Sequence, residues 1–169
     1  MSPLRPPVVR LLYFALSLFL FGMDRGTKAL VVGRLPLNES VTVVKGFFHI
    51  THVANTGALF GLLAGLASPL RGLVFIAVPV LAIALILFFQ LRSGEGDILT
   101  QMGLSLILAG ALGNLYDRIR FGHVVDFLDL SVAGHHWPAF NVADSCICVG
   151  VFTLVLDLYR REQRPAPPS

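Results

Sequence analysis

Residues 109–118 read Ala-Gly-Ala-Leu-Gly-Asn-Leu-Tyr-Asp-Arg, residues 123–126 read His-Val-Val-Asp, and residues 138–144 read Pro-Ala-Phe-Asn-Val-Ala-Asp. Ionisable groups set against apolar helices of membrane length cost free energy, so they usually mark a functional site. This stretch therefore predicts both the architecture and the place of the chemistry. It sets six polar or charged side chains on or beside two long apolar segments: Asn114, Asp117, Arg118, Asp126, Asn141 and Asp144.

The composition around this stretch is that of an integral membrane protein. Of the 169 residues, 55% are hydrophobic and only 14% are charged, and the mean hydropathy is +0.76. A soluble domain would carry about 25% charged residues. The net charge of +3 comes from scattered basic residues, which indicates membrane lipids as partners and no nucleic acid.

We expect an all-α membrane protein made of one domain, residues 1–169. Four spans of about 20 residues would use nearly half of this length. The first span shows no small-x-small cleavage site after its apolar run, so it is read as an uncleaved helix. Basic residues near both ends of the chain predict that both termini are cytoplasmic. The four expected transmembrane helices cover about 8–32, 72–91, 98–116 and 139–159.

Residues 33–68 lack a spanning signal and predict a small periplasmic cap. Residues 40–45 and 47–53 are rich in β-branched and aromatic side chains around Lys45-Gly46, which favours a β-hairpin. Asn55-Thr56-Gly57 indicates a tight turn, and the apolar residues 58–67 a short strand or interfacial segment.

Two histidines of the cap, His49 and His52, lie three residues apart. No third ligand at metal spacing accompanies them, so we expect ordinary strand residues and no metal site.

Asp126 and Asp144 are the candidate catalytic pair. Asp126 follows the third expected span, and Asp144 lies five residues into the fourth, about 7 Å below its start, so both approach the same membrane boundary. Two carboxyls in a poorly hydrated site share one proton. The ionised member can activate a water while the protonated member stabilises the oxyanion. This chemistry is that of an aspartic peptidase and needs no cofactor.

Structural explanations compete with this hypothesis for single residues. Asn141 followed three residues later by Asp144 imitates a helix-capping box, and Asp126 alone would pass for a solvated loop acid. Asp24 and Lys28 form either a self-neutralising pair or part of the site. Gly110 either admits a ligand or allows tight helix packing. The joint occurrence of the polar residues at one membrane depth favours a site.

Five motifs together resemble lipoprotein signal peptidases, also called signal peptidase II or prolipoprotein signal peptidase. They are Asp24-Arg-Gly-Thr-Lys28, Asn55-Thr-Gly-Ala58, Gly110-Ala-Leu-Gly-Asn-Leu-Tyr-Asp-Arg118, Val124-Val-Asp-Phe127 and Phe140-Asn-Val-Ala-Asp144. They occur in the order of that family and cover most of the chain. Arg25 departs from the family, which often has Gln at this position.

The resemblance implies a monomeric aspartic endopeptidase of the bacterial inner membrane, with its active site near the periplasmic face. Its substrate would be a prolipoprotein that carries diacylglycerol on a cysteine and is cleaved just before that cysteine. Asp126 and Asp144 would be catalytic, without cofactor or metal. The residues expected to bind substrate or shape the site are Asp24, Lys28, Asn55, Gly57, Gly110, Asn114, Asp117, Arg118, Asn141 and Ala143.

Two other functions would also account for parts of this sequence. A small four-helix proton-coupled transporter could use Asp117 and Asp144 as relay groups, but it would place acids near mid-span and show pseudo-symmetry between its halves. Here the acids cluster at one edge, apart from Asp157 near the cytoplasmic end, and no repeat is visible. A presenilin-like peptidase would share Tyr116-Asp117 but also needs Gly-x-Gly-Asp, which the sequence lacks.

Overall fold

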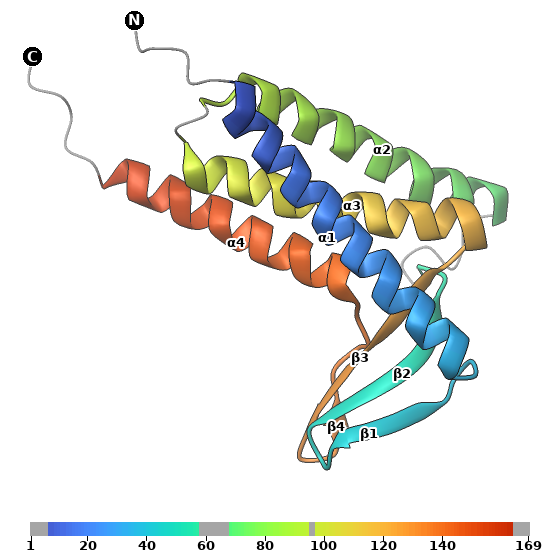
Figure 1. Cartoon of the computed structure of the whole chain (residues 1–169). Helices are drawn as coiled ribbons and strands as arrows, with labels where there is room; N and C mark the ends of the chain where they lie inside the picture. Colours follow the sequence, from blue (N-terminus) through green and yellow to red (C-terminus); the bar gives the residue numbers. More distant parts are fainter. Residues whose placement is uncertain (1–6, 58–67, 95–96, 164–169) are drawn as a thin grey trace, which may run out of the picture.

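The computed structural model describes residues 7–57, 68–94 and 97–163. Figure 1 shows its four helices alongside one another, with a β-sheet at one end of the bundle. The start of the first helix and the end of the fourth both lie at the opposite end of the bundle. The helices are α1 (Pro7–Arg34), α2 (Ser68–Arg92), α3 (Ile98–Phe121) and α4 (Val142–Glu162).

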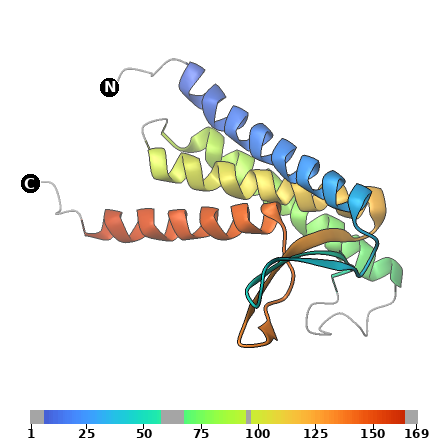
Figure 2. The same ribbon diagram turned by 60° about the horizontal axis from the view of Figure 1, so that its bottom comes forward.

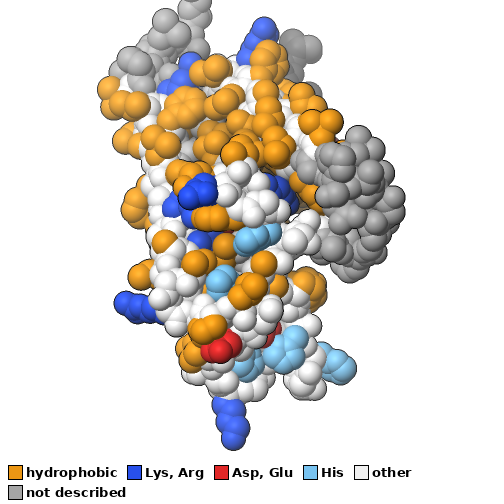
Figure 3. Space-filling model, turned by 90° about the vertical axis from the view of Figure 1, so that its right-hand side faces the viewer, with side chains coloured by type: hydrophobic (Ala, Val, Ile, Leu, Met, Phe, Trp, Pro, Cys, Tyr) orange, Lys and Arg blue, Asp and Glu red, His pale blue; other side chains and the backbone are white. Residues whose placement is uncertain are grey.

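Three of the described helices are long and apolar enough to cross a membrane: Leu73–Arg92, Ile98–Phe121 and Val142–Glu162. Only 6% of the apolar window of α2 is buried in the protein, so its side chains face outward. Figure 3 shows hydrophobic side chains over most of the helical half of one face. The helix α1 is 28 residues long but is not among these three, so the predicted fourth span stays a prediction.

The helix α3 occupies the centre of the bundle, because it packs against α1, α2 and α4. Its Leu104 and Leu108 form an apolar core with Ile86 of α2. Buried polar groups add interhelical bonds, since Ser17 of α1 donates to the carbonyl oxygen of Ser105 at 3.0 Å. Such bonds hold helices together where lipid offers no competing partner.

The sheet has four antiparallel strands in the order β1-β2-β3-β4. Its first pair, β1 (Ser40–Val44) and β2 (Phe48–Asn55), confirms the predicted hairpin. Figure 2 shows the sheet lying across one end of the helices. Residues 58–67, the expected interfacial segment, lie outside the described residues.

The other two strands, β3 (Val124–Val132) and β4 (His135–His136), were not predicted. The start of β3 is a short apolar run, which periodicity does not distinguish from the end of a helix. Its partner β2 is distant in the sequence, and the pairing of Val53 with Asp126 sets the register. Asp126 is therefore a residue of the sheet and not of a solvated loop.

Two helix boundaries also differ from those expected. The third helix runs to Phe121, and Gly122 ends it with a left-handed φ of 76°. The fourth begins at Val142 and not at residue 139, because Asn141 caps it. Asp144 consequently lies in the first turn of α4, and the expected depth of about 7 Å below the helix start is wrong.

Candidate active site

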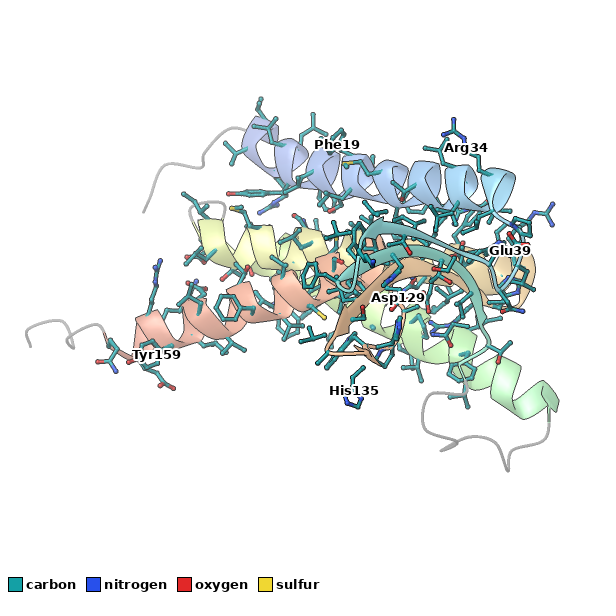
Figure 4. The ribbon with its side chains drawn as sticks, turned by 90° about the horizontal axis from the view of Figure 1, so that it is seen from below. Phe19, Arg34, Glu39, Asp129, His135 and Tyr159 are labelled. Carbon is teal, nitrogen blue, oxygen red and sulfur yellow. The ribbon has the colours of Figure 1, made fainter. Side chains whose placement is uncertain are left out.

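Asp126 of β3 and Asp144 of α4 line the same cavity, whose volume is about 690 Å³. Asp126 is only 2% exposed, whereas Asp144 is partly buried. Figure 4 views this end of the molecule, where the sheet crosses the helices. The remaining walls are Asn55, Asn114, Arg118, Val124, Leu130, Trp137, Pro138, Ala139, Phe140, Ser145, Cys148 and Val149.

Asn141 connects the two acids. Its Nδ2 donates a hydrogen bond to Oδ1 of Asp126 at 2.6 Å, and its Oδ1 accepts one from the backbone N–H of Asp144 at 2.9 Å. The backbone N–H of Asn141 in turn donates to Oδ2 of Asp144 at 3.2 Å. The capping box expected as a structural alternative is therefore present, and its first residue also contacts the other acid.

Two further amides orient the carboxyl groups. Asn55 Nδ2 donates to Oδ2 of Asp126 at 2.8 Å, and Asn114 Nδ2 donates to Oδ1 of Asp144 at 2.7 Å. Asn55 itself is held because its Oδ1 accepts from the backbone N–H of Gly57 at 2.9 Å. Gly57 has a φ of 80°, which a glycine adopts without strain. Each acid thus receives an amide donor from a different element.

Beneath these amides lies a cluster of buried charges from α1 and α3. Lys28 Nζ lies 2.9 Å from Oδ2 of Asp24 and 2.8 Å from Oδ2 of Asp117, and it donates to Oδ1 of Asn114 at 3.3 Å. Arg25 also pairs with Asp117. Buried charges are tolerated only when they are paired, and here two cations oppose two carboxylates.

This cluster also fixes the backbone next to each candidate catalytic acid. Asp117 Oδ2 accepts from the N–H of Val125 at 3.2 Å, one residue before Asp126. Asp24 Oδ1 accepts from the N–H of Ala143 at 3.0 Å, one residue before Asp144. The buried ion pairs of α1 and α3 therefore position β3 and α4 relative to each other.

The glycines of α3 allow α4 to approach closely. A Cβ atom at Gly110 would collide with the carbonyl oxygen of Ala143 and lie 2.7 Å from Cγ1 of Ile147. At Gly113 it would lie 2.6 Å from Oδ2 of Asp24. Of the two explanations offered for Gly110, the structure supports tight helix packing. Ala143 is 1% exposed and belongs to this contact.

Burial sets the protonation behaviour of Asp126. Loss of hydration raises the pKa of its carboxyl, with a smaller contribution from the negative charge of Asp144, and the net value is about 6. Hydrogen bonds from Asn55 and Asn141 and the charge of Lys28 lower the pKa in part. Asp126 therefore takes up a proton more readily than an ordinary aspartate.

The structure brings all ten expected supporting residues to this region, and it adds some that were not among the expected site residues. Leu130, Trp137 and Phe140 form apolar wall, and Arg25 stacks 4.3 Å from the ring centre of Tyr116 while pairing with Asp117. The only sign of this role in the sequence was that Arg25 directly follows Asp24. Arg118 lies on the wall with its guanidinium 5.3 Å from the ring of Phe75.

The molecule is an apolar helix bundle with two carboxyl groups on one cavity, each held by an amide donor. This arrangement is typical of membrane enzymes with an aspartic peptidase type of site. A family model described as "Signal peptidase (SPase) II" matches residues 16–160. The chain belongs to the signal peptidase II family and is a membrane protease.

Individual relatives agree with this assignment. The chain is 47% identical over 141 residues to the lipoprotein signal peptidase of Syntrophus aciditrophicus, covering 83% of this chain and 88% of the relative. It is 48% identical over 142 residues to that of Geobacter metallireducens, covering 84% and 86%. A solved bacterial membrane enzyme superposes with a TM-score of 0.80 at 28% identity, covering 93% and 94%.

Proposed function

We propose that this protein removes signal peptides from diacylglyceryl-modified prolipoproteins, with Asp126 and Asp144 as its catalytic pair. The observation that carries this proposal is the linkage of the two acids on one cavity. Asn141 donates to Asp126 and caps the helix turn that presents Asp144. The transporter alternative lacks support, since the family consists of proteases.

The reaction would begin with a water between the two carboxyls. Asp126 would be the protonated member of the pair, in line with its raised pKa of about 6, and Asp144 would accept a proton as the water oxygen bonds to the scissile carbonyl carbon. Protonated Asp126 donates a hydrogen bond to the developing oxyanion. The C–N bond then breaks, and the proton taken up by Asp144 passes to the leaving amine. Water supplies the oxygen of the new carboxyl group.

The cavity suits a substrate that is partly lipid. Leu130, Trp137 and Phe140 give it apolar wall beside the acids, and the neighbouring helices carry exposed hydrophobic side chains such as Val149. An acyl chain in the bilayer can lie against these side chains while the peptide reaches the carboxyls. Arg118 offers a cation to the polar part of the lipid.

The same geometry supports a membrane placement. With α1 as a fourth span, the start of α1 and the end of α4 share one side (Figure 1). Arg160 and Arg161 lie in the last turn of α4, and basic residues favour the cytoplasm. The sheet and the two acids would then face the periplasm, with the helices in the inner membrane of a bacterium. The described residues of the site come from a single chain, which agrees with a monomer.

Purified protein and a diacylglyceryl-modified precursor test this proposal. Asp126→Asn and Asp144→Asn should each lower kcat by at least about 10⁴-fold, as for essential members of a catalytic unit. Both should keep the melting temperature in detergent near that of the unchanged protein. Asp97→Asn is the matched control, since Asp97 lies directly before α3 and outside the cavity lining. Near-normal turnover by either dyad variant would refute the assignment.

A further inference from the structure

A second cluster of chemistry-bearing side chains lies on the sheet, away from the cavity. Strand pairing places His49 of β2 directly opposite Asp129 of β3, and β4 returns along β3 with His136 opposite Ser131. Figure 3 shows histidine side chains beside acidic ones at the sheet end of the molecule. Potential ligand atoms of His49, Asp129 and His136 all lie within 4.8 Å of one another.

The Nδ1 atom of His49 gives independent evidence for a bound ion. It is buried, yet it has no hydrogen-bond partner within residues 7–57, 68–94 and 97–163. It lies 3.9 Å from Oδ2 of Asp129, too far for a hydrogen bond. A buried polar atom left without a partner costs free energy and calls for an explanation. An ion between the imidazole and the carboxylate would supply one.

Two imidazoles and one carboxylate form a donor set that a zinc ion accepts. His136 Nδ1 lies 2.9 Å from both oxygens of Asp129. A tetrahedral zinc about 2.0 Å from each ligand separates ligand atoms by about 3.3 Å, which lies between the two distances that Asp129 makes to the histidines. His49 and Asp129 are mostly buried, whereas the side chain of His136 is 56% exposed. The open side leaves a fourth position for water.

We propose that His49, Asp129 and His136 form a zinc-binding site on the sheet, separate from the peptidase cavity. The bound ion would fasten the two-residue strand β4 to β2 and β3. Trp137 follows His136 directly, lines the cavity, and donates its backbone N–H to Leu130 at 2.7 Å. The ion would thus order the cavity wall at Trp137.

Sequence spacing points to the wrong partner for His49. His52, three residues away, directs its Nδ1 to the carbonyl oxygen of Leu35 at 2.8 Å and is 9% exposed. The other two ligands come from β3 and β4, which only the folded sheet brings near. The sequence showed no third ligand near His49 and His52, and for that reason no metal site was expected. The ligands proposed here are far apart in the chain, so sequence spacing does not reveal them.

Cobalt titration tests the site without using peptidase activity, so its outcome is independent of the proposed function. Protein without a histidine tag is stripped with a chelator in detergent and titrated with Co²⁺, whose visible absorption reports tetrahedral coordination. One Co²⁺ per chain should bind, and one equivalent of Zn²⁺ should displace it. His136→Ala should weaken binding by at least about 100-fold, since loss of even an outer partner costs 10–100-fold.

His135→Ala is the matched control. His135 is exposed, neighbours His136 in the chain, and projects away from the sheet in Figure 4, so this variant should bind Co²⁺ as the unchanged protein does. Equal melting temperatures of the metal-free variants and the unchanged protein show that the variants are folded. His136→Gln keeps a polar side chain and serves as a second variant for the Co²⁺ titration. No saturable tetrahedral Co²⁺ signal, or equal binding by His136→Ala or His136→Gln, would overturn the proposal.

Discussion

The Nδ2 of Asn141 donates a hydrogen bond to Oδ1 of Asp126 at 2.6 Å. The same side chain accepts from the backbone N–H of Asp144 and caps α4. One side-chain amide therefore caps a helix and bonds to the other acid of the candidate pair. The structural and functional explanations of this motif are therefore compatible.

Exchange of Asn141 separates the two roles. Asn141→Ala should cost about 1 kcal/mol through loss of the cap and should lower turnover at least about tenfold, because Asp126 loses its closest donor. Asn141→Ser keeps an N-capping oxygen but is too short to donate to Asp126, so only turnover should fall. Melting temperature and kcat measured on both variants provide the check. Full turnover by the serine variant would contradict the bridging role.

Removal of Lys28 should destabilise the protein strongly. Lys28→Met leaves Asp24 and Asp117 buried with less compensation, and breaking a buried pair by removing one partner costs about 3–5 kcal/mol. Both carboxylates are at most 1% exposed. Chemical or thermal unfolding in detergent measures the loss.

The double variant Asp24→Asn/Lys28→Met serves as the control for this charge balance. It removes one negative charge with the positive one, while an asparagine oxygen can still accept from Ala143. It should recover part of the stability lost by Lys28→Met. A double variant less stable than Lys28→Met would show that the attraction between charges is not what holds α1 to the site.

Gly110→Ala should push α4 away from α3. The added Cβ would overlap the carbonyl oxygen of Ala143, a backbone atom that cannot rotate aside, and such overpacking costs about 1–3 kcal/mol. Because Asp144 follows Ala143, turnover should fall as well. Gly22→Ala is the matched control: a Cβ there meets nothing within 4 Å, so helix stability should hold or rise by up to about 1 kcal/mol. Equal behaviour of the two variants would contradict the packing role of Gly110.

Asp126 should make stability depend on pH. Its pKa is about 6 in the folded protein against 3.8 for an ordinary aspartate, so the folded state binds the proton more tightly. The resulting stabilisation is present below about pH 4 and is lost as pH rises through about 6. Melting temperatures measured from pH 4 to 7 should therefore fall more steeply for the unchanged protein than for Asp126→Asn. If the melting temperatures of the two proteins changed in parallel with pH, the pKa of Asp126 would not be raised by burial.

Lipidation of the precursor should control cleavage. If the acyl chains lie against the apolar walls and help position the peptide, the unlipidated precursor should be a poor substrate, with kcat/KM lowered at least about 100-fold. Parallel assays with the two precursor forms test this. Equal cleavage of both forms would exclude a role for the lipid while leaving the catalytic pair in place.

Local features of the chain were predictable, and features that depend on distant pairing were not. The hairpin around Lys45-Gly46 follows from neighbouring residues, and the helix pattern placed Asn114, Asp117 and Arg118 on one side. The strand β3 was missed because its apolar start resembles a continuing helix. Its identity depends on β2, which lies on the other side of two helices in the sequence.

The sequence by itself determined the apolar bundle and the motifs of the family, because hydropathy and residue spacing act over a few turns of chain. Only the tertiary structure decided that Asn141 reaches Asp126, that Asp24 and Asp117 hold the backbone before each acid, and that His49 meets Asp129 and His136. These contacts depend on strand register and on the close packing of α3 against α4. Both join segments far apart in the chain, so no local pattern specifies them.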